Sequence, residues 1–184
     1  NYEYVRGVQP IDNSSDENSS GLDPHQAEII VDAESGHSDE IAQTIFNNIP
    51  MGIDLVNGVN GSAQSGTASL PNGQKFTIKY SNPAELNIYI DVDLDYKGIV
   101  TKEEVKNSIV EYIGGAKTNG ELIYGELGVD DDVLQGEAEY EVRDIPGVYD
   151  VNNLYMDTSS SPTSSSNISI PSDSKGVVDH ANIS

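Results

Sequence analysis

The chain has 184 residues and no cysteine, and its 31 acidic and 9 basic residues give a formal net charge of −22. The absence of cysteine excludes a disulfide framework and a thiolate metal site. The negative charge argues against binding to nucleic acid or to an anionic membrane surface, and no run approaches the roughly 18 apolar residues of a membrane span. We therefore expect neither a nucleic acid partner nor membrane insertion.

The acidic residues are spread along the whole chain, and periodic apolar residues lie between them. This pattern is typical of a folded domain with an acidic surface rather than of a disordered acidic tail. Such a surface repels itself unless salt screens the charges, and the Debye length falls to about 3 Å at 1 M salt. The composition thus favours a halophilic source, the alternative being an ordinary acidic protein.

The N-terminal part predicts two strands around a loop. Residues 4–8 are predicted as one strand, and residues 12–21 have the Asn, Ser, Asp and Gly content of a loop. Residues 27–31 are rich in β-branched side chains and bounded by polar residues, which predicts a buried strand.

A helix is expected next, with Ser38 as its N-cap and two acids in its first turn, where the helix dipole favours them. Pro50 ends this helix. Its apolar face is formed by residues at helical spacing, namely Ile41, Ala42, Ile45, Phe46 and Ile49. Residues 51–66 are rich in Gly and Asn and predict a long loop. The Asn72-Gly73 turn then predicts a hairpin between residues 68–70 and 76–80.

The clearest strand covers residues 86–95, where apolar and polar residues alternate strictly. Three acids share its polar face: Asp91, Asp93 and Asp95. Their spacing resembles the start of an EF-hand calcium loop, but Tyr96 and Lys102 stand where that loop needs Gly and Glu. We therefore interpret the acids as the solvent-exposed face of a strand, with calcium binding as the alternative. Asp130-Asp131-Asp132 is likewise interpreted as a solvated loop.

The clearest helix follows this strand. Thr101 and Glu104 predict a capping box, and Gly114-Gly115 predicts the end of the helix. Its core stripe comprises Val105, Ile109, Tyr112 and Ile113. Residues 121–128 predict either a strand or an irregular crossing.

The C-terminal third gives weaker signals. Apolar residues at helical spacing predict a further helix despite Gly136: Leu134, Ala138, Val142 and Ile145. After a turn at Pro146-Gly147, residues 148–156 predict a strand. Residues 159–166 are a low-complexity Ser/Thr/Pro loop, residues 167–170 are expected to form a last strand, and the tail after Pro171 is expected to be extended.

This order of elements predicts an α+β fold with two small modules, each with a helix packed on a short, mostly antiparallel sheet. The first module is expected over residues 24–81 and the second over residues 82–158. Residues 1–23 are expected to be the end of an upstream strand plus a loop, and residues 159–184 a Ser-rich loop, a final strand and an extended tail. Because Asn1 replaces a start Met and no signal pattern follows it, we expect residues upstream of it.

Five segments in this order resemble the baseplate J-like family of phage-type tail proteins. Residues 21–31 resemble its GLPPHSxEVxV segment, residues 38–46 its DEEIAxAIF, and residues 50–58 its xxAGIxTxGN. Residues 73–80 followed by 86–94 resemble its IxFxRP and VxVxVxL strands, and residues 146–151 match its closing PGVxDV. The resemblance covers roughly residues 5 to 184, the C-terminal part of the family.

Two departures from the family pattern concern loops. Residues 34–37 replace the family's paired glycines before the helix, and residues 79–83 lack the Arg of its RP step. The resemblance implies a wedge protein in the tail baseplate of a virion, which assembles around the central hub in several symmetric copies. It implies other baseplate and tail subunits as partners. Together with the acidic composition, it implies a haloarchaeal virus or a related injection system.

No enzyme, cofactor or metal site is expected. The three histidines, His25, His37 and His180, lie in predicted loops, and no Gly-x-Ser-x-Gly elbow or Gly-rich phosphate loop occurs. Five Asn-x-Ser sequons stand in predicted loops or in the tail, at Asn13, Asn18, Asn60, Asn167 and Asn182. They keep open an alternative function, a secreted or cell-surface adhesion or binding module of a halophilic microbe.

Overall fold

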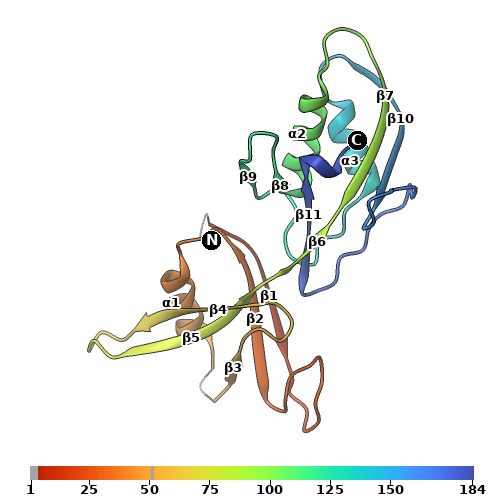
Figure 1. The fold of residues 1–184 in the computed structure, drawn as a ribbon. Coiled ribbons are helices and arrows are strands. Elements are labelled where there is room, and N and C mark those ends of the chain that lie inside the picture. Colours follow the sequence, from red (N-terminus) through yellow and green to blue (C-terminus); the bar gives the residue numbers. More distant parts are fainter. Residues whose placement is uncertain (1–3, 51) are drawn as a thin grey trace. The chain divides into compact units, whose positions relative to one another are not determined.

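The computed structural model describes residues 4–50 and 52–184, and it has the α+β architecture that the sequence predicts (Figure 1). The chain forms two compact units. The first comprises Asn1–Ala84 with Ser172–Ser174, and the second comprises Glu85–Pro171 with Lys175–Ser184. This division differs from the predicted ranges at both chain ends, because the first strand pairs inside the first unit and most of the last strand joins the second.

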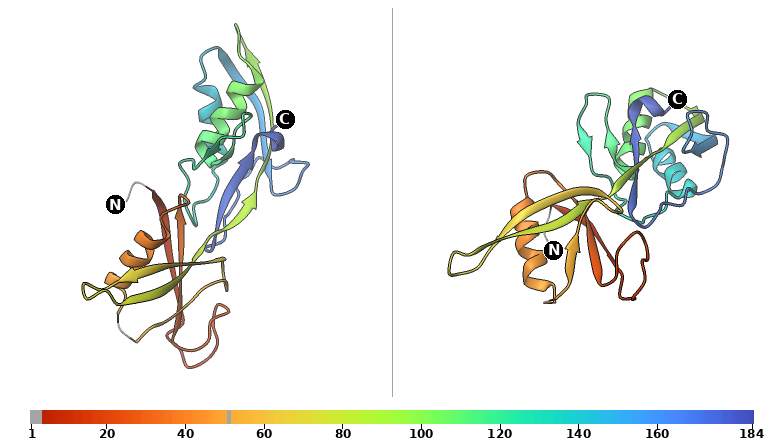
Figure 2. Two further views of the ribbon diagram at one scale, coloured as in Figure 1. Left: turned by 60° about the vertical axis from the view of Figure 1, so that its left-hand side comes forward. Right: turned by 60° about the horizontal axis from the view of Figure 1, so that its bottom comes forward.

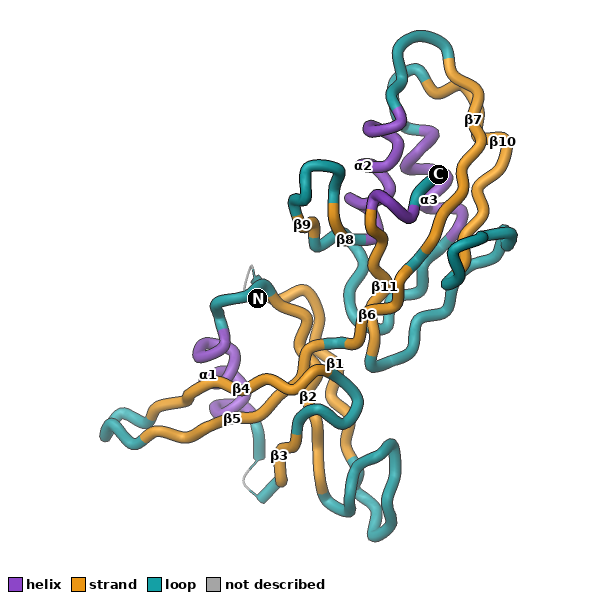
Figure 3. Tube along the Cα trace, in the orientation of Figure 1, coloured by secondary structure: helices purple, strands orange, loops and turns teal. Residues whose placement is uncertain are grey.

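The first unit contains a five-stranded mixed sheet in the order β1-β2-β5-β4, with β3 beside β2 (Figure 3). Its strands are β1 (Val5–Asp12), β2 (Gln26–Ala33), β3 (Asp54–Val56), β4 (Ser62–Ser69) and β5 (Lys75–Asn82). β1 and β2 are antiparallel, β4 and β5 form the predicted hairpin, and β2 is parallel to β3 and β5. The predicted loop over residues 51–66 is wrong in part, since β3 and the start of β4 lie within it; Met51 is outside the described residues.

One helix, α1 (Ser38–Asn48), packs against β4 and β5. Three of the five predicted helix residues are buried between helix and sheet, and Phe46 and Ile49 pack against this core partly exposed. The buried core comprises Val31, Ile41, Ala42, Ile45, Ala68, Ile78 and Tyr80. Gly66 of β4 allows the close approach, because a Cβ there would collide with the backbone of Ser38 and with Ala42. Two α1 side chains also bond the outer edge of β4: Asp39 accepts from Thr67 N at 2.7 Å and Gln43 from Ser69 N at 2.8 Å.

The start of α1 differs from the prediction. Ser38 is the first helical residue, His37 occupies the N-cap position, and its side chain makes no capping hydrogen bond. The His37 ring instead stacks on Tyr4, with ring centroids 3.9 Å apart. A tertiary aromatic contact therefore replaces the local serine cap that the sequence suggested.

In the second unit, two helices lie on one side of a long antiparallel strand pair (Figure 2). The strands are β7 (Tyr89–Tyr96) and β10 (Val148–Asp157), and the helices are α2 (Lys102–Ile113) and α3 (Gln135–Arg143). A second sheet has the order β6-β11-β8-β9. Its strands are β6 (Ala84–Asn87), β11 (Ser174–Asp179), β8 (Gly115–Ala116) and β9 (Leu122–Ile123), and a short helix, η1 (His180–Asn182), follows β11.

Both predicted boundaries of α2 are confirmed. Thr101 is the N-cap and forms the capping box with Glu104. Gly114 ends the helix with φ 99°. The predicted core stripe is buried together with Ile88, which lies between β6 and β7, and with residues of β7, β10 and β11. These strand residues include Ile90, Leu154, Met156 and Val178.

Two sequence expectations for this unit need correction. The strand expected over residues 86–95 is two strands with different partners, since β6 pairs with β11 and β7 pairs with β10. Residues 121–128, expected as a strand or an irregular crossing, contain the two-residue strand β9. The last strand lies at β11 and not at residues 167–170, where Ile168 forms an isolated bridge with Val133. These pairings join residues far apart in sequence.

Candidate functional site

The three histidines each have a carboxylate as a close polar neighbour. His25 lies 3.3 Å from Asp16, His37 lies 3.8 Å from Glu40, and His180 lies 3.1 Å from Asp179. His25 precedes β2 and His37 follows it, so an eight-residue strand, roughly 26 Å long, separates them. These surroundings are those of exposed or half-exposed surface histidines, and none resembles a base held beside a nucleophile.

The predicted exposed face of β7 is confirmed. Ile90 is fully buried, whereas Asp91, Asp93 and Asp95 are exposed. Carboxylates on one face of a strand stand roughly 6.5–7 Å apart from one position to the next, which is too far to converge on a calcium ion. Within residues 4–50 and 52–184, no group of three or more potential ligands could hold a metal ion.

The acidic run at residues 130–132 makes structural hydrogen bonds. Asp131 accepts from Gly128 N at 2.7 Å. Asp132 accepts from Ile170 N at 2.8 Å and from Ser169 Oγ at 3.1 Å. These bonds hold two loops of the second unit together. The sequence predicted only that the acids lie in a solvated loop.

The asparagines of the five sequons differ in exposure and in hydrogen bonding. Asn13 is buried, and its Nδ2 donates to the carbonyls of Glu17 and Leu22. Nδ2 of Asn60 donates to Glu28 at 3.0 Å. These two amides are occupied in the folded chain. Asn18 and Asn167 are exposed, although Asn18 Nδ2 donates to Asp23 at 3.0 Å and Asn167 Oδ1 accepts from Gln135 N at 3.0 Å.

A buried carboxylate in the first unit was missed by sequence reasoning. Glu28 of β2 is fully buried, and it accepts from Val59 N, Asn60 N, Asn60 Nδ2 and Ser81 Oγ. Burial raises the pKa of this carboxyl, but the bonds from Ser81, Asn60 and Val59 outweigh burial and hold the pKa below its usual value. The signal in the sequence is a lone Glu between Ala27 and Ile29 in an otherwise buried strand, which indicates a paired rather than a solvated acid.

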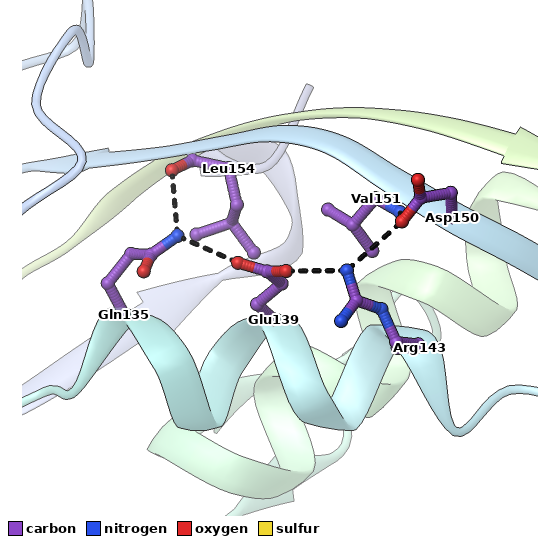
Figure 4. A network of polar contacts seen from close by, with 6 residues as sticks. All are labelled: Gln135, Glu139, Arg143, Asp150, Val151 and Leu154. Atoms are coloured by element: carbon purple, nitrogen blue, oxygen red, sulfur yellow. Dashed lines mark hydrogen bonds and ion pairs between the residues drawn. The ribbon is translucent and has the colours of Figure 1, made fainter.

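A polar network joins α3 to β10 (Figure 4). Arg143 donates to Glu139 at 2.7 Å and to Asp150 at 3.1 Å. Gln135 donates to Glu139 at 3.2 Å and to the carbonyl of Leu154 at 3.5 Å. The side chains lie along one face of the helix, facing the strand. Their arrangement fixes the helix on the sheet.

The surface of the second unit offers a different kind of site. Large apolar side chains are exposed near the junction of β7, α2 and β10: Tyr96 at 58%, Ile99 at 92% and Tyr149 at 68%. Beside them, a cavity of about 220 Å³ lies between β7 and the start of α2. Its apolar lining comes from Val92, Leu94, Val100, Val105 and Ile183. Exposed apolar residues around a hollow are typical of contact surfaces between proteins.

Compared with known proteins, the chain matches no family model and no curated protein. Among the helices of the described residues, none is long and apolar enough to cross a membrane.

Proposed function

We propose that this protein is a structural, non-catalytic wedge component of a viral tail baseplate, which assembles around the tail hub through contacts with other baseplate and tail subunits. The observation that carries the proposal is the ordered resemblance of five segments to the baseplate J-like family. The acidic composition extends it to a virus of a halophilic host, because molar salt screens a net charge of −22.

The fold offers support of a general kind. The resembling segments coincide with successive elements: residues 21–31 with β2 and its preceding turn, residues 38–46 with α1, and residues 146–151 with the start of β10. Much of the polar chemistry in the described residues serves the fold itself. Glu28 fixes a loop, Asp132 joins two segments, and Arg143 fixes α3. Such an arrangement suits a rigid building block.

The experiment that tests the proposal is fractionation of the source culture. Tail particles, cell envelopes and cytosol are separated at molar salt, and peptides of this chain are quantified by mass spectrometry in each fraction. We expect the chain to follow the tail particles, together with other tail proteins. Recovery as a free cytosolic monomer that turns over a small substrate would contradict the proposal.

The second candidate, a cell-surface or secreted module, is favoured by the exposure of the sequon residues Asn18 and Asn167. It predicts recovery of the chain in the envelope fraction or the medium, with a glycan mass on one of these two residues. The tail proposal predicts unmodified Asn18 and Asn167 in particles, so peptide masses distinguish the two functions.

A further inference from the structure

The outer face of the β4–β5 hairpin carries no acid, in a chain that has 31 of them. Phe76, Ile78 and Tyr80 of β5 face α1, so the residues between them face solvent. The turn of the hairpin projects past the helix (Figure 1). Three residues of β5 and their cross-strand neighbours on β4 form what we call the lysine face: Lys75, Thr77, Lys79, Ser69, Thr67 and Ser65.

The side chains of the lysine face have donors to spare. Lys75 and Lys79 are exposed and form no ion pair within the described residues, whereas Arg6, Lys117 and Arg143 each pair with a glutamate. The hydroxyls of the same face have no hydrogen-bond partner in that part of the chain either. The edge of β4 is closed by side chains of α1, so a partner would lie on the face and would not extend the sheet.

A second strand pair of this chain presents the opposite chemistry. Across the ladder from the acids of β7 stand Tyr155, Asn153 and Asp150, and Asp150 is already paired with Arg143. The acids themselves form no ion pair within the described residues. Exposed at every second residue of β7, they form what we call the aspartate face: Asp91, Asp93 and Asp95.

The lysines near β7 are engaged elsewhere or lie on its other side. Lys97 lies 4.4 Å from the centroid of the Tyr149 ring. Lys102 and Lys106 belong to α2, which packs on the buried side of the strand pair, and Lys106 donates to the carbonyl of His180 at 3.0 Å. The aspartate face therefore lacks a basic partner within the second unit.

We propose that the lysine face of one copy of this chain binds the aspartate face of another copy. On both strands the polar side chains recur at every second residue, roughly 6.5–7 Å apart, so the two rows match in spacing. The two lysines of β5 reach the outer two aspartates of β7, and the Thr77 hydroxyl donates to the middle one. Ammonium and hydroxyl donors on carboxylates form the stronger class of hydrogen bond.

The contact joins two different surfaces, so each copy keeps one free face for a further neighbour. Contacts of this kind generate a closed ring or an open filament. The inference rests on the two faces and not on the tail assignment, although a closed ring of copies suits a baseplate.

Salt decides whether two copies with a net charge of −22 can approach each other. In dilute buffer the distant acids repel. At 1 M salt the Debye length is about 3 Å, so this repulsion is screened, while donors and carboxylates in contact at about 2.7–2.9 Å are screened less. Exposed ion pairs are individually weak, so several must form at once and the copies must be concentrated. We therefore expect the contact at molar salt and high protein concentration.

The test is zero-length cross-linking of the full chain under these conditions. A carbodiimide joins a lysine amine directly to a carboxylate, so only groups in contact react. Labelled (¹⁵N) and unlabelled copies are mixed, and a cross-linked pair that contains one peptide of each kind comes from two copies. We expect such mixed pairs to join Lys75 or Lys79 to the acids of the aspartate face.

Charge exchange separates this contact from general effects of charge. Asp91→Lys with Asp95→Lys lowers the overall repulsion, yet we expect about tenfold fewer mixed pairs because both faces are then basic. Lys75→Glu with Lys79→Glu should have the same effect. All four substitutions together leave the net charge at −22, because the changes cancel, and should restore mixed pairs between the introduced lysines and glutamates.

The control, Asp12→Lys with Glu85→Lys, changes two exposed acids outside both faces and should keep the yield of mixed pairs within about twofold. Circular dichroism verifies that every variant folds.

Three results would overturn the proposal. The first is cross-links of Lys75 and Lys79 confined to single copies, and the second is mixed pairs spread evenly over the acids of the chain. The third is a folded fourfold variant that fails to restore mixed pairs. None of these results bears on the tail assignment, which the fractionation tests separately.

Discussion

Replacing Glu28 with Gln tests how the first unit is held together. One amide oxygen can keep the position of Oε1, which accepts from Val59 N and Ser81 Oγ. The amide NH2 then faces Asn60 N and Asn60 Nδ2, whose bonds to Oε2 measure 2.7 and 3.0 Å. Two half-buried donors lose their acceptor, and a fully buried one would cost about 1–3 kcal/mol. We expect Glu28→Gln to lower the free energy of unfolding of this unit by about 1–3 kcal/mol.

The assay is native-state hydrogen exchange at Ile30, a fully buried residue in the same strand, with urea unfolding as a second measure. Glu34→Gln is the matched control, since it makes the same change at an exposed acid paired with Arg6. Exposed pairs contribute about 0–1 kcal/mol, so a small effect is expected. Equal effects of the two substitutions would refute the role given to Glu28.

Four further predictions follow from the same contacts. The pKa of Glu28 is lower in the folded chain than in the unfolded chain, so its contribution to stability is present above about pH 4.3 and is lost as the pH falls through the folded pKa. In the Glu28→Gln variant, the free energy of unfolding of the first unit should therefore fall less steeply as the pH is lowered. Gly66→Ala should displace α1 and lower the free energy of unfolding by more than about 1 kcal/mol, measured by urea unfolding. Gly136→Ala is the control, because Gly136 has no positive φ and no atom lies within 4 Å of its added Cβ. Ile90→Asp should unfold the second unit while Asp93→Asn leaves it folded, as circular dichroism will show; equal stability would contradict the assigned faces of β7. The thermal midpoint of the isolated chain should rise steeply between dilute buffer and molar salt, and a flat response would remove the case for a halophilic source.

The elements that the sequence predicted correctly depend on residues close to one another in the chain. The capping box of Thr101 and Glu104 involves residues three apart, and it places the start of α2 correctly. The alternation on β7 identifies Ile90 as buried and Asp91 as exposed. The Asn72-Gly73 turn fixes the register of the β4–β5 hairpin, in which Ala68 faces Phe76.

The features that sequence reasoning missed depend on distant pairing. β11 pairs with β6 and β8, and no pattern within residues 174–179 predicts this pairing. Glu28 is buried because Ser81 and Asn60 come to it from elsewhere in the chain.

The most direct test of the tail assignment is a count of copies in the assembled particle. Intact tails purified at molar salt are imaged by electron cryo-microscopy, and the density of the two units is located in the averaged baseplate. The proposal predicts that both units fit density in a ring around the hub, repeated by the symmetry of the tail. Baseplate density fully explained by other proteins, with this chain absent from the particle, would contradict it.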